Sequence, residues 1–257
     1  MSRSEVIARF KGISLSQMDS VKLMNRTDRK YWFNVNHLEG LLLDIVDDYY
    51  VLEIEGGRNL PYSTTYYDTW GDHMYMTHHR GKLNRFKIRR RNYVTTDSSF
   101  LEIKFKSNKG RTIKKRIPTD YRNPHFNESE GVFVADKSPY RVEELHPVLV
   151  NGFRRLMLVS KSMNERVTID QDLAFMSNGV EAKLSELVVV EVKSEGRAKS
   201  AIIDAMHSRR LKASGFSKYC MGRSITDQKL KHNLFKFKHR MIERHIERPL
   251  ESVVSKA

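Results

Sequence analysis

The sequence contains little cysteine, which excludes two classes of site. Cys220 is the only cysteine among 257 residues, so the chain can form no internal disulfide and no zinc site built on several thiolates. We interpret Cys220 as a small buried apolar residue, because structural cysteines are more common than reactive ones.

Long hydrophobic runs are also absent. The first residues, MSRSEVIARFKGISL, lack the uninterrupted apolar stretch of a signal peptide, and no run approaches the roughly 18 apolar residues of a membrane span. We therefore expect a cytoplasmic location.

Glycine and proline are few and scattered, with 13 and 6 residues respectively, so no linker stands out, and no repeat of solenoid period is present. A length of 257 residues suits one large domain. We expect a single domain over residues 1–257, with an N-terminal helical segment at 1–24 and a basic C-terminal helix at 226–250.

Acidic residues are scarce in one stretch, and this stretch carries most of the net charge. Between Arg80 and Arg116 there are 14 lysines and arginines against 2 acids, Asp97 and Glu102, which gives +12 of the formal +15. The rest of the chain is nearly balanced in charge. A local concentration of cations of this kind indicates a polyanionic ligand.

The basic stretch alternates as β-strands do. In RFKIRRR every second residue is Arg85, Lys87, Arg89 or Arg91, and LEIKFK alternates in the same way around Lys104. Neighbouring side chains of a strand point to opposite faces, so each segment has one charged and one mostly apolar face. Consecutive antiparallel strands are expected, and we also predict strands at HMYMTHHR and FSKYC.

The charged face recurs along the chain. Its members are Arg26 with Lys30, Arg89 with Arg91, Glu102 with Lys104, Lys114 with Arg116, Arg166 with Asp170, and Glu191 with Lys193. A closed barrel with a charged lumen and helices on its outer face would satisfy all of these segments together. An open sheet with a basic surface is the alternative, and the alternation does not separate the two.

Two carboxylates lie inside these cationic rows. Glu102 and Glu191 each precede a lysine by two residues on a predicted strand. Either carboxylate could neutralise a neighbouring cation. Either could instead hold Mg²⁺ or Mn²⁺, since hard divalent ions are bound by one or two carboxylates together with substrate phosphates and water.

With these residues in place, the sequence resembles the VTC domain, the polyphosphate polymerase domain of the triphosphate tunnel fold, from about Leu23 to Gly222. The matching blocks, in order, are RTDRKYWF, STTYYDT, KIRRRNY, LEIKFK, GRTIKKRI, ERVTID, VVEVK and FSKY. The resemblance implies an α+β fold in which an antiparallel eight-stranded β-barrel forms a basic tunnel, with helices packed on the outside.

The resemblance also implies site residues. The phosphate ligands would be Lys30, Arg89, Arg91, Lys104, Lys114, Arg155, Arg166 and Lys218, and the metal carboxylate would be Glu191. Arg26 and Lys193, which alternate on the same strands, complete the phosphate-binding set, and Glu102 is a second candidate metal ligand. We expect the residues that act on the reacting triphosphate to be Arg89, Arg91, Lys104, Lys114 and Glu191. Arg154 would replace Arg155 if the register shifted by one residue.

The implied activity is transfer of the γ-phosphate of ATP, or of another nucleoside triphosphate, to a growing inorganic polyphosphate chain, with Mn²⁺ or Mg²⁺. Hydrolytic tunnel enzymes carry an ExExK pattern on their first strand, where this chain has Arg26, Asp28 and Lys30. The smaller number of carboxylates suits binding of a phosphate chain better than attack by water. A triphosphate hydrolase or cyclase of the same fold is the disfavoured alternative, and a non-catalytic module that binds polyphosphate or nucleotide is another.

Two further predictions concern partners. We expect no specific nucleic-acid partner, because no recognised reader motif is present. The basic tail from Asp227 to Ala257 leaves a membrane-embedded partner as an interaction to be tested.

Overall fold

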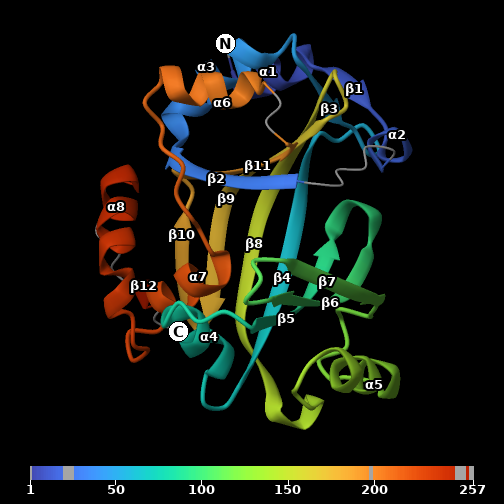
Figure 1. The fold of residues 1–257 in the computed structure, drawn as a ribbon, viewed down its shortest axis with the longest axis vertical. Helices are drawn as coiled ribbons and strands as arrows, with labels where there is room; N and C mark the ends of the chain where they lie inside the picture. Colours follow the sequence, from blue (N-terminus) through green and yellow to red (C-terminus); the bar gives the residue numbers. More distant parts are fainter. Residues whose placement is uncertain (1, 20–25, 197–198, 247–252, 255–257) are drawn as a thin grey trace.

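The computed structural model describes residues 2–19, 26–196, 199–246 and 253–254 (Figure 1). The helices are α1 (Arg3–Arg9), α2 (Leu15–Asp19), α3 (Leu38–Ile45), α4 (His73–His79), α5 (Glu128–Lys137), α6 (Ala201–Ser208), α7 (Lys218–Thr226) and α8 (Lys236–Ile246), with 3-10 turns η1 (Val35–His37), η2 (Val94–Thr96), η3 (Val142–Glu144) and η4 (Asn233–Phe235). The strands are β1 (Lys11–Ile13), β2 (Arg26–Asn34), β3 (Tyr49–Leu52), β4 (Asn59–Thr69), β5 (Arg85–Tyr93), β6 (Ser98–Lys106), β7 (Thr112–Pro118), β8 (Leu145–Ser160), β9 (Glu165–Ser177), β10 (Val180–Leu184), β11 (Leu187–Glu195) and β12 (Val253–Val254).

One large sheet organises the chain. Across the described residues it has 12 strands, and an antiparallel path of paired strands runs β2, β11, β9, β8, β4, β5, β6, β7. The mixed architecture with a large antiparallel sheet and surrounding helices is confirmed.

The expected closed barrel is wrong. Within the described residues no ladder joins β2 to β7, so both are edge strands. The two edges carry cations on the same face, Lys30 on β2 and both Lys114 and Arg116 on β7. Closing the sheet would bring the like charges of the two edge strands closer together, which is unfavourable.

The apolar outer face explains the position of three helices. Val188, Val190 and Val192 of β11 are fully buried, and they belong to one cluster with side chains of α1, α3 and α6. These helices gather over β2 and β11 in Figure 1. Helix α3 contributes Leu38, Leu41, Leu42 and Ile45, which recur at helical spacing. The alternation therefore separates a covered apolar face from a charged one.

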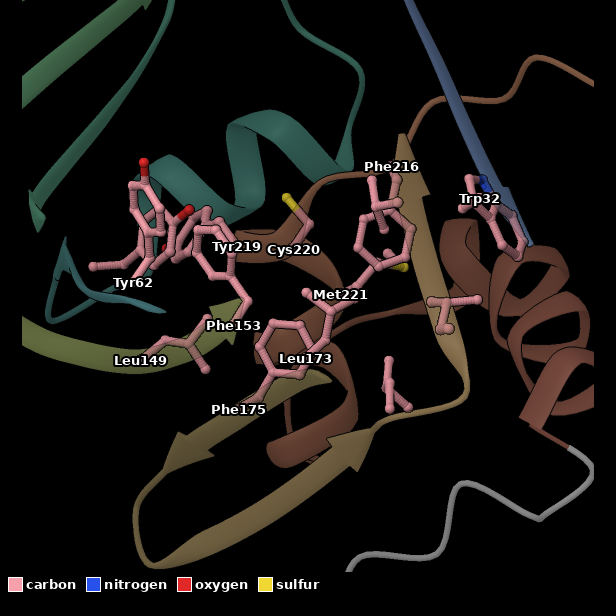
Figure 2. Packing of buried hydrophobic residues seen from close by; sticks show 14 of the residues in the cluster. Trp32, Tyr62, Leu149, Phe153, Leu173, Phe175, Phe216, Tyr219, Cys220 and Met221 are labelled. Carbon is pink, nitrogen blue, oxygen red and sulfur yellow. The ribbon is translucent and has the colours of Figure 1, made fainter. Parts of the chain in front are cut away.

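Helix α7 packs very closely on the sheet. A Cβ atom at Gly222 would lie 2.5 Å from Phe175 Cδ1 and 2.7 Å from Leu149 Cδ2, so only glycine allows this approach. Figure 2 shows Leu149 and Phe175 beside Met221 and Tyr219 of the helix. Cys220 is fully buried in the same cluster, as predicted. The close packing fixes the N-terminus of α7, and with it Lys218.

Two predicted strands are helices. HMYMTHHR forms α4, because the Asp68 carboxylate accepts hydrogen bonds from the backbone N–H groups of Met74 and Tyr75 at 2.9 and 2.8 Å. FSKYC runs into α7, where Ser217 caps the helix by accepting from the N–H of Cys220 at 3.2 Å. In both segments, side chains that accept hydrogen bonds from the first N–H groups of a helix favour the helix over the predicted strand.

The structure divides each of the two predicted terminal segments. In place of one helix from residue 226, α7 ends at Thr226 and α8 begins at Lys236, while residues 247–250 lie outside the described part. At the other end α1 and α2 are separated by β1, and residues 1 and 20–24 lie outside. Among the described residues, no helix combines the length and the apolar character needed to cross a membrane.

Candidate functional site

The charged side chains of the sheet share its inner face, opposite the one covered by α1, α3 and α6. Cross-strand partners lie on the same face, so the register identifies the rows. One row joins Lys87, Lys104 and Lys114. The other rows are Arg89 with Glu102 and Arg116, Lys30 with Glu191 and Thr168, and Arg155 with Asp170.

Glu102 holds two of the cations. It is 1% exposed and accepts from Arg89 Nε and Nη2 at 2.8 and 2.6 Å, and from Lys114 Nζ at 3.0 Å. Burial acts to raise the pKa of Glu102, but Arg89, Arg91 and Lys114 outweigh it and lower the pKa below its usual range. Both carboxylate oxygens are occupied by cations, so the geometry favours an ion-pair partner over a metal ligand.

Asp170 forms a second ion-pair cluster. It accepts from Arg155 Nε and Nη2 at 2.5 and 2.8 Å, and from the Lys218 ammonium at the start of α7. Burial opposes the charge of Asp170, but these two cations lower its pKa below the usual range. Arg154 instead donates to the Asn59 carbonyl oxygen and is exposed, so Arg155 is the inward residue.

Glu191 is held more loosely. Its carboxylate lies 3.5 Å from Lys30 Nζ and 3.6 Å from Lys193 Nζ, and its side chain is 20% exposed. Burial acts to raise its pKa, but Lys30, Lys193 and Lys104 lower it to about 2. The described residues contain no cluster of three His, Cys, Asp or Glu side chains that could chelate a metal alone. Glu191 therefore suits an ion that takes its other ligands from phosphate and water.

Two lysines in the row of Lys87, Lys104 and Lys114 have lowered pKa values. Burial, together with the charges of Lys30 and Lys87, lowers the pKa of Lys104 to about 7. Burial is also the main cause that lowers the pKa of Lys87 to about 8, and its ammonium donates to Ser217 Oγ at 3.1 Å. Positive charge is unfavourable on this part of the face in the absence of an anion.

A sequence profile of the VTC domain matches residues 25–226. The chain belongs to the VTC domain family. The resemblance expected from the sequence is thus confirmed. No curated protein matches the chain.

Solved structures resemble this VTC domain in fold. A proposed adenylyl cyclase from Hippeastrum, described as having a dominant triphosphatase activity, is 16% identical, with a TM-score of 0.52 and coverage of 82% of this chain and 99% of that chain. A proposed adenylate cyclase from Bacillus halodurans is 11% identical, with a TM-score of 0.49 and coverage of 76% and 96%. One from Vibrio parahaemolyticus is 11% identical, with a TM-score of 0.45 and coverage of 78% and 99%.

The VTC domain brings most of the predicted site residues onto one face. Arg91 is 8% exposed and donates from Nε to Thr64 Oγ1 at 3.4 Å. Lys193 pairs in register with Arg166, whose guanidinium donates to the Met18 carbonyl oxygen. Arg26 begins β2, and its side chain lies outside the described part.

Sequence reasoning missed parts of this face. The sequence alternates Asp170 with Arg166 but does not mark it as a site residue. The predicted site also lacks Lys87, although Lys87 belongs to the same period-two row as Arg89. Tyr66, whose hydroxyl accepts from Arg89 Nη1 at 3.3 Å, carried no signal that separates it from a core residue. The pairing of strands, which brings these groups together, was needed to find them.

Replacing Glu102 tests the ion-pair cluster. Glu102→Gln leaves Arg89 and Lys114 without their negative partner, so we expect a loss of about 3 kcal/mol in the free energy of unfolding. Inorganic tripolyphosphate should stabilise the variant more than the wild type, because the anion replaces the missing charge. Thermal and urea unfolding with and without tripolyphosphate measure both effects.

The matched control is Asp97→Asn, which breaks an exposed pair with Arg122 whose side chains are 59% and 61% exposed. Its cost should stay below about 1 kcal/mol. Equal costs for the two variants, or equal stabilisation by the anion, would contradict the assigned role of Glu102.

The lowered lysine pKa values predict proton uptake on anion binding. In the free protein Lys104 and Lys87 are partly neutral near pH values of about 7 and 8. A bound triphosphate favours their protonated forms, so affinity should rise as the pH falls from about 9 to about 7. Calorimetry at about pH 8, above the phosphate pKa of about 6, in two buffers of different ionisation enthalpy measures the uptake.

Lys104→Met should reduce this uptake, whereas Lys115→Met, on the outward face of β7, should leave it unchanged. Heat of binding that does not depend on the buffer would show that the lysines are already fully charged.

Proposed function

We propose that the chain is a polyphosphate polymerase, which transfers the γ-phosphoryl group of ATP to the end of a growing inorganic polyphosphate chain on the inner face of the sheet. The observation that carries the proposal is the convergence of cations from both halves of a VTC domain around one loosely held carboxylate. Lys30, Arg89 and Lys104 come from different strands, and all influence the charge of this face.

Catalysis of phosphoryl transfer depends mainly on positioning the reacting groups and on neutralising their negative charge. Little covalent chemistry is needed from protein, because the transferring group spreads negative charge over its equatorial oxygens. In the proposal Arg89, Arg91, Lys104 and Lys114 hold the triphosphate, and the guanidinium groups offer forked contacts that lysines cannot. Arg155, Arg166, Lys193 and Lys218, with Arg26 and Lys30, hold the acceptor chain. Its terminal phosphate is already anionic, so no general base is required.

Glu191 is the residue that fits a divalent cation. Its carboxylate is accessible and lies more than 3.4 Å from either lysine, at 3.5 and 3.6 Å, so one oxygen could bind Mn²⁺ or Mg²⁺ that is shared with the phosphates. Such an ion would supply a Lewis acid that neutralises charge on the transferring group. Lys30 and Lys193 flank the Glu191 carboxylate.

Hydrolysis of triphosphate is the second candidate, favoured by the activity described for the Hippeastrum protein of similar fold. On the inner face a carboxylate would be the general base that activates water, and the accessible Glu191 is assigned to the metal in this proposal. Glu102 and Asp170 are each held by two cations and are therefore unavailable for this task.

The polymerase proposal also includes a cytoplasmic location and a membrane-embedded partner that receives the product.

The test is incubation of purified protein with ATP and Mn²⁺, followed by gel separation of the phosphate products. Long chains are the expected result. Free phosphate would show a triphosphatase, and unchanged ATP with retained binding would show a binding module. Glu191→Ala should lower the rate roughly 100-fold, the upper end of what changes around a bound metal cost.

Glu181→Ala is the matched control, because Glu181 forms an exposed pair with Lys183 on β10. Its rate should equal that of the wild type. Full turnover by Glu191→Ala would remove Glu191 from the proposed mechanism.

A further inference from the structure

Helix α8 is held to the domain by one of its sides. Ile242 is fully buried, and the His245 ring lies edge-on to Trp32 of β2, with 5.4 Å between the ring centroids. On the same side the Lys238 ammonium donates to the Gly215 carbonyl oxygen at 2.8 Å. Figure 1 shows the helix at the flank of the molecule. The contacts of this inner side fix the helix and leave its outer side facing solvent.

The outer side carries large apolar side chains. Phe237 is 72% exposed, and Leu234, in the turn η4 that leads into the helix, is 60% exposed. A single exposed apolar residue is common on protein surfaces and needs no partner to explain it. The exposure of these two neighbouring residues is informative only together with the charges around them.

Cations surround the two apolar side chains. Lys236, Arg240 and Arg244 are exposed, and the sequence of α8 has one acid, Glu243, against four lysines and arginines. Arg240 and Arg244 follow Phe237 by three and seven residues, so the three side chains lie along one line of the helix. We call the exposed residues Leu234, Lys236, Phe237, Arg240 and Arg244 the outer ridge.

Helix α5 has a similar exposed apolar residue in surroundings of the opposite charge. Val132 is 65% exposed, and Glu128 and Asp136, four residues before and after it, are exposed as well. An anionic surface would attract the outer ridge of α8 and repel this part of α5. The charge around α8 therefore favours an anionic partner for its apolar residues.

We propose that the outer ridge docks on an anionic lipid surface, with Phe237 and Leu234 inserted among the headgroups. Helices that lie in the membrane interface combine apolar and aromatic side chains with lysine and arginine in this way. The long stems of the cations reach past the apolar residues to the headgroup charges. A nucleic acid would pair with the same cations but would leave Leu234 in water.

This docking does not rest on the proposed function. Helix α8 lies beyond residues 25–226, which match the VTC domain, and its ridge is on the outside of the fold. The docking also differs from binding to a membrane-embedded partner, since it requires lipid alone.

The experiment mixes the full chain with sucrose-loaded vesicles and measures the protein that sediments with them. Vesicles of phosphatidylcholine with phosphatidylserine should bind the chain roughly 100-fold more tightly than phosphatidylcholine alone, because three cations contribute. Added salt should weaken the binding, since it screens the charges. Equal binding to the two kinds of vesicle, or to neither, would overturn the proposal.

Substitutions on the ridge locate the contact. Phe237→Ser should weaken binding roughly tenfold through lost apolar burial, and Arg240→Ala roughly fivefold through lost charge. The matched controls are Val132→Ser on α5 and Lys183→Ala on β10, where Lys183 is 67% exposed. Both controls should bind as the wild type does, and thermal unfolding checks that each variant is folded.

The inner face is a second cationic surface that the lipid could contact. Saturation with tripolyphosphate occupies that face and, at matched ionic strength, should leave vesicle binding unchanged. Loss of binding under this condition, or equal effects of the ridge variants and their controls, would overturn docking through α8. Either result would leave the proposed function intact, because product formation from ATP is measured without lipid.

Discussion

The cations of the inner face repel one another, and the fold depends on two buried carboxylates that separate them. Glu102 lies between Arg89 and Lys114, and Asp170 lies between Arg155 and Lys218. Each carboxylate stays ionised because its two partners outweigh the cost of burial. Without them the same strands would place unpaired charges in a poorly hydrated space, which proteins tolerate only at a large cost.

Glu102 and Asp170 neutralise only part of the positive charge on the inner face. The remaining positive charge suits the binding of an anion. Lys104 and Lys87 are left with lowered pKa values, and Glu191 is too far from its lysines for a close pair. A bound phosphate chain would relieve this excess of positive charge. Repulsion among the cations destabilises the free protein, and the same cations would attract a bound anion. A ligand that binds only the folded state stabilises it.

The sequence predicted best what depends on local alternation. The period-two rows of β5 and β6 are a property of each strand alone, so the placement of Arg89 and Arg91 on one face of their strand could be predicted without knowledge of the fold. Helix α4 could not, because its start depends on hydrogen bonds from the Asp68 side chain, and HMYMTHHR reads equally well as a strand. Closure of the sheet could not be predicted either, since it depends on whether β2 and β7 meet.

The sequence alone also could not predict which residues pair across neighbouring strands. The pairing of Arg155 with Asp170 requires the register of β8 on β9, which shifts at an irregularity between Gly152 and Arg154. A single-residue shift moves every side chain to the other face, so pattern alone left Arg154 and Arg155 as alternatives.

The central claim is that the inner face of the sheet binds the triphosphate. The most direct measurement is a crystal structure of the protein with tripolyphosphate and Mn²⁺. The account predicts phosphate oxygens in contact with Arg89, Arg91 and Lys104, and the metal between the anion and Glu191. An anion bound on the outer face or at the C-terminal helix, with the inner face unchanged, would contradict it.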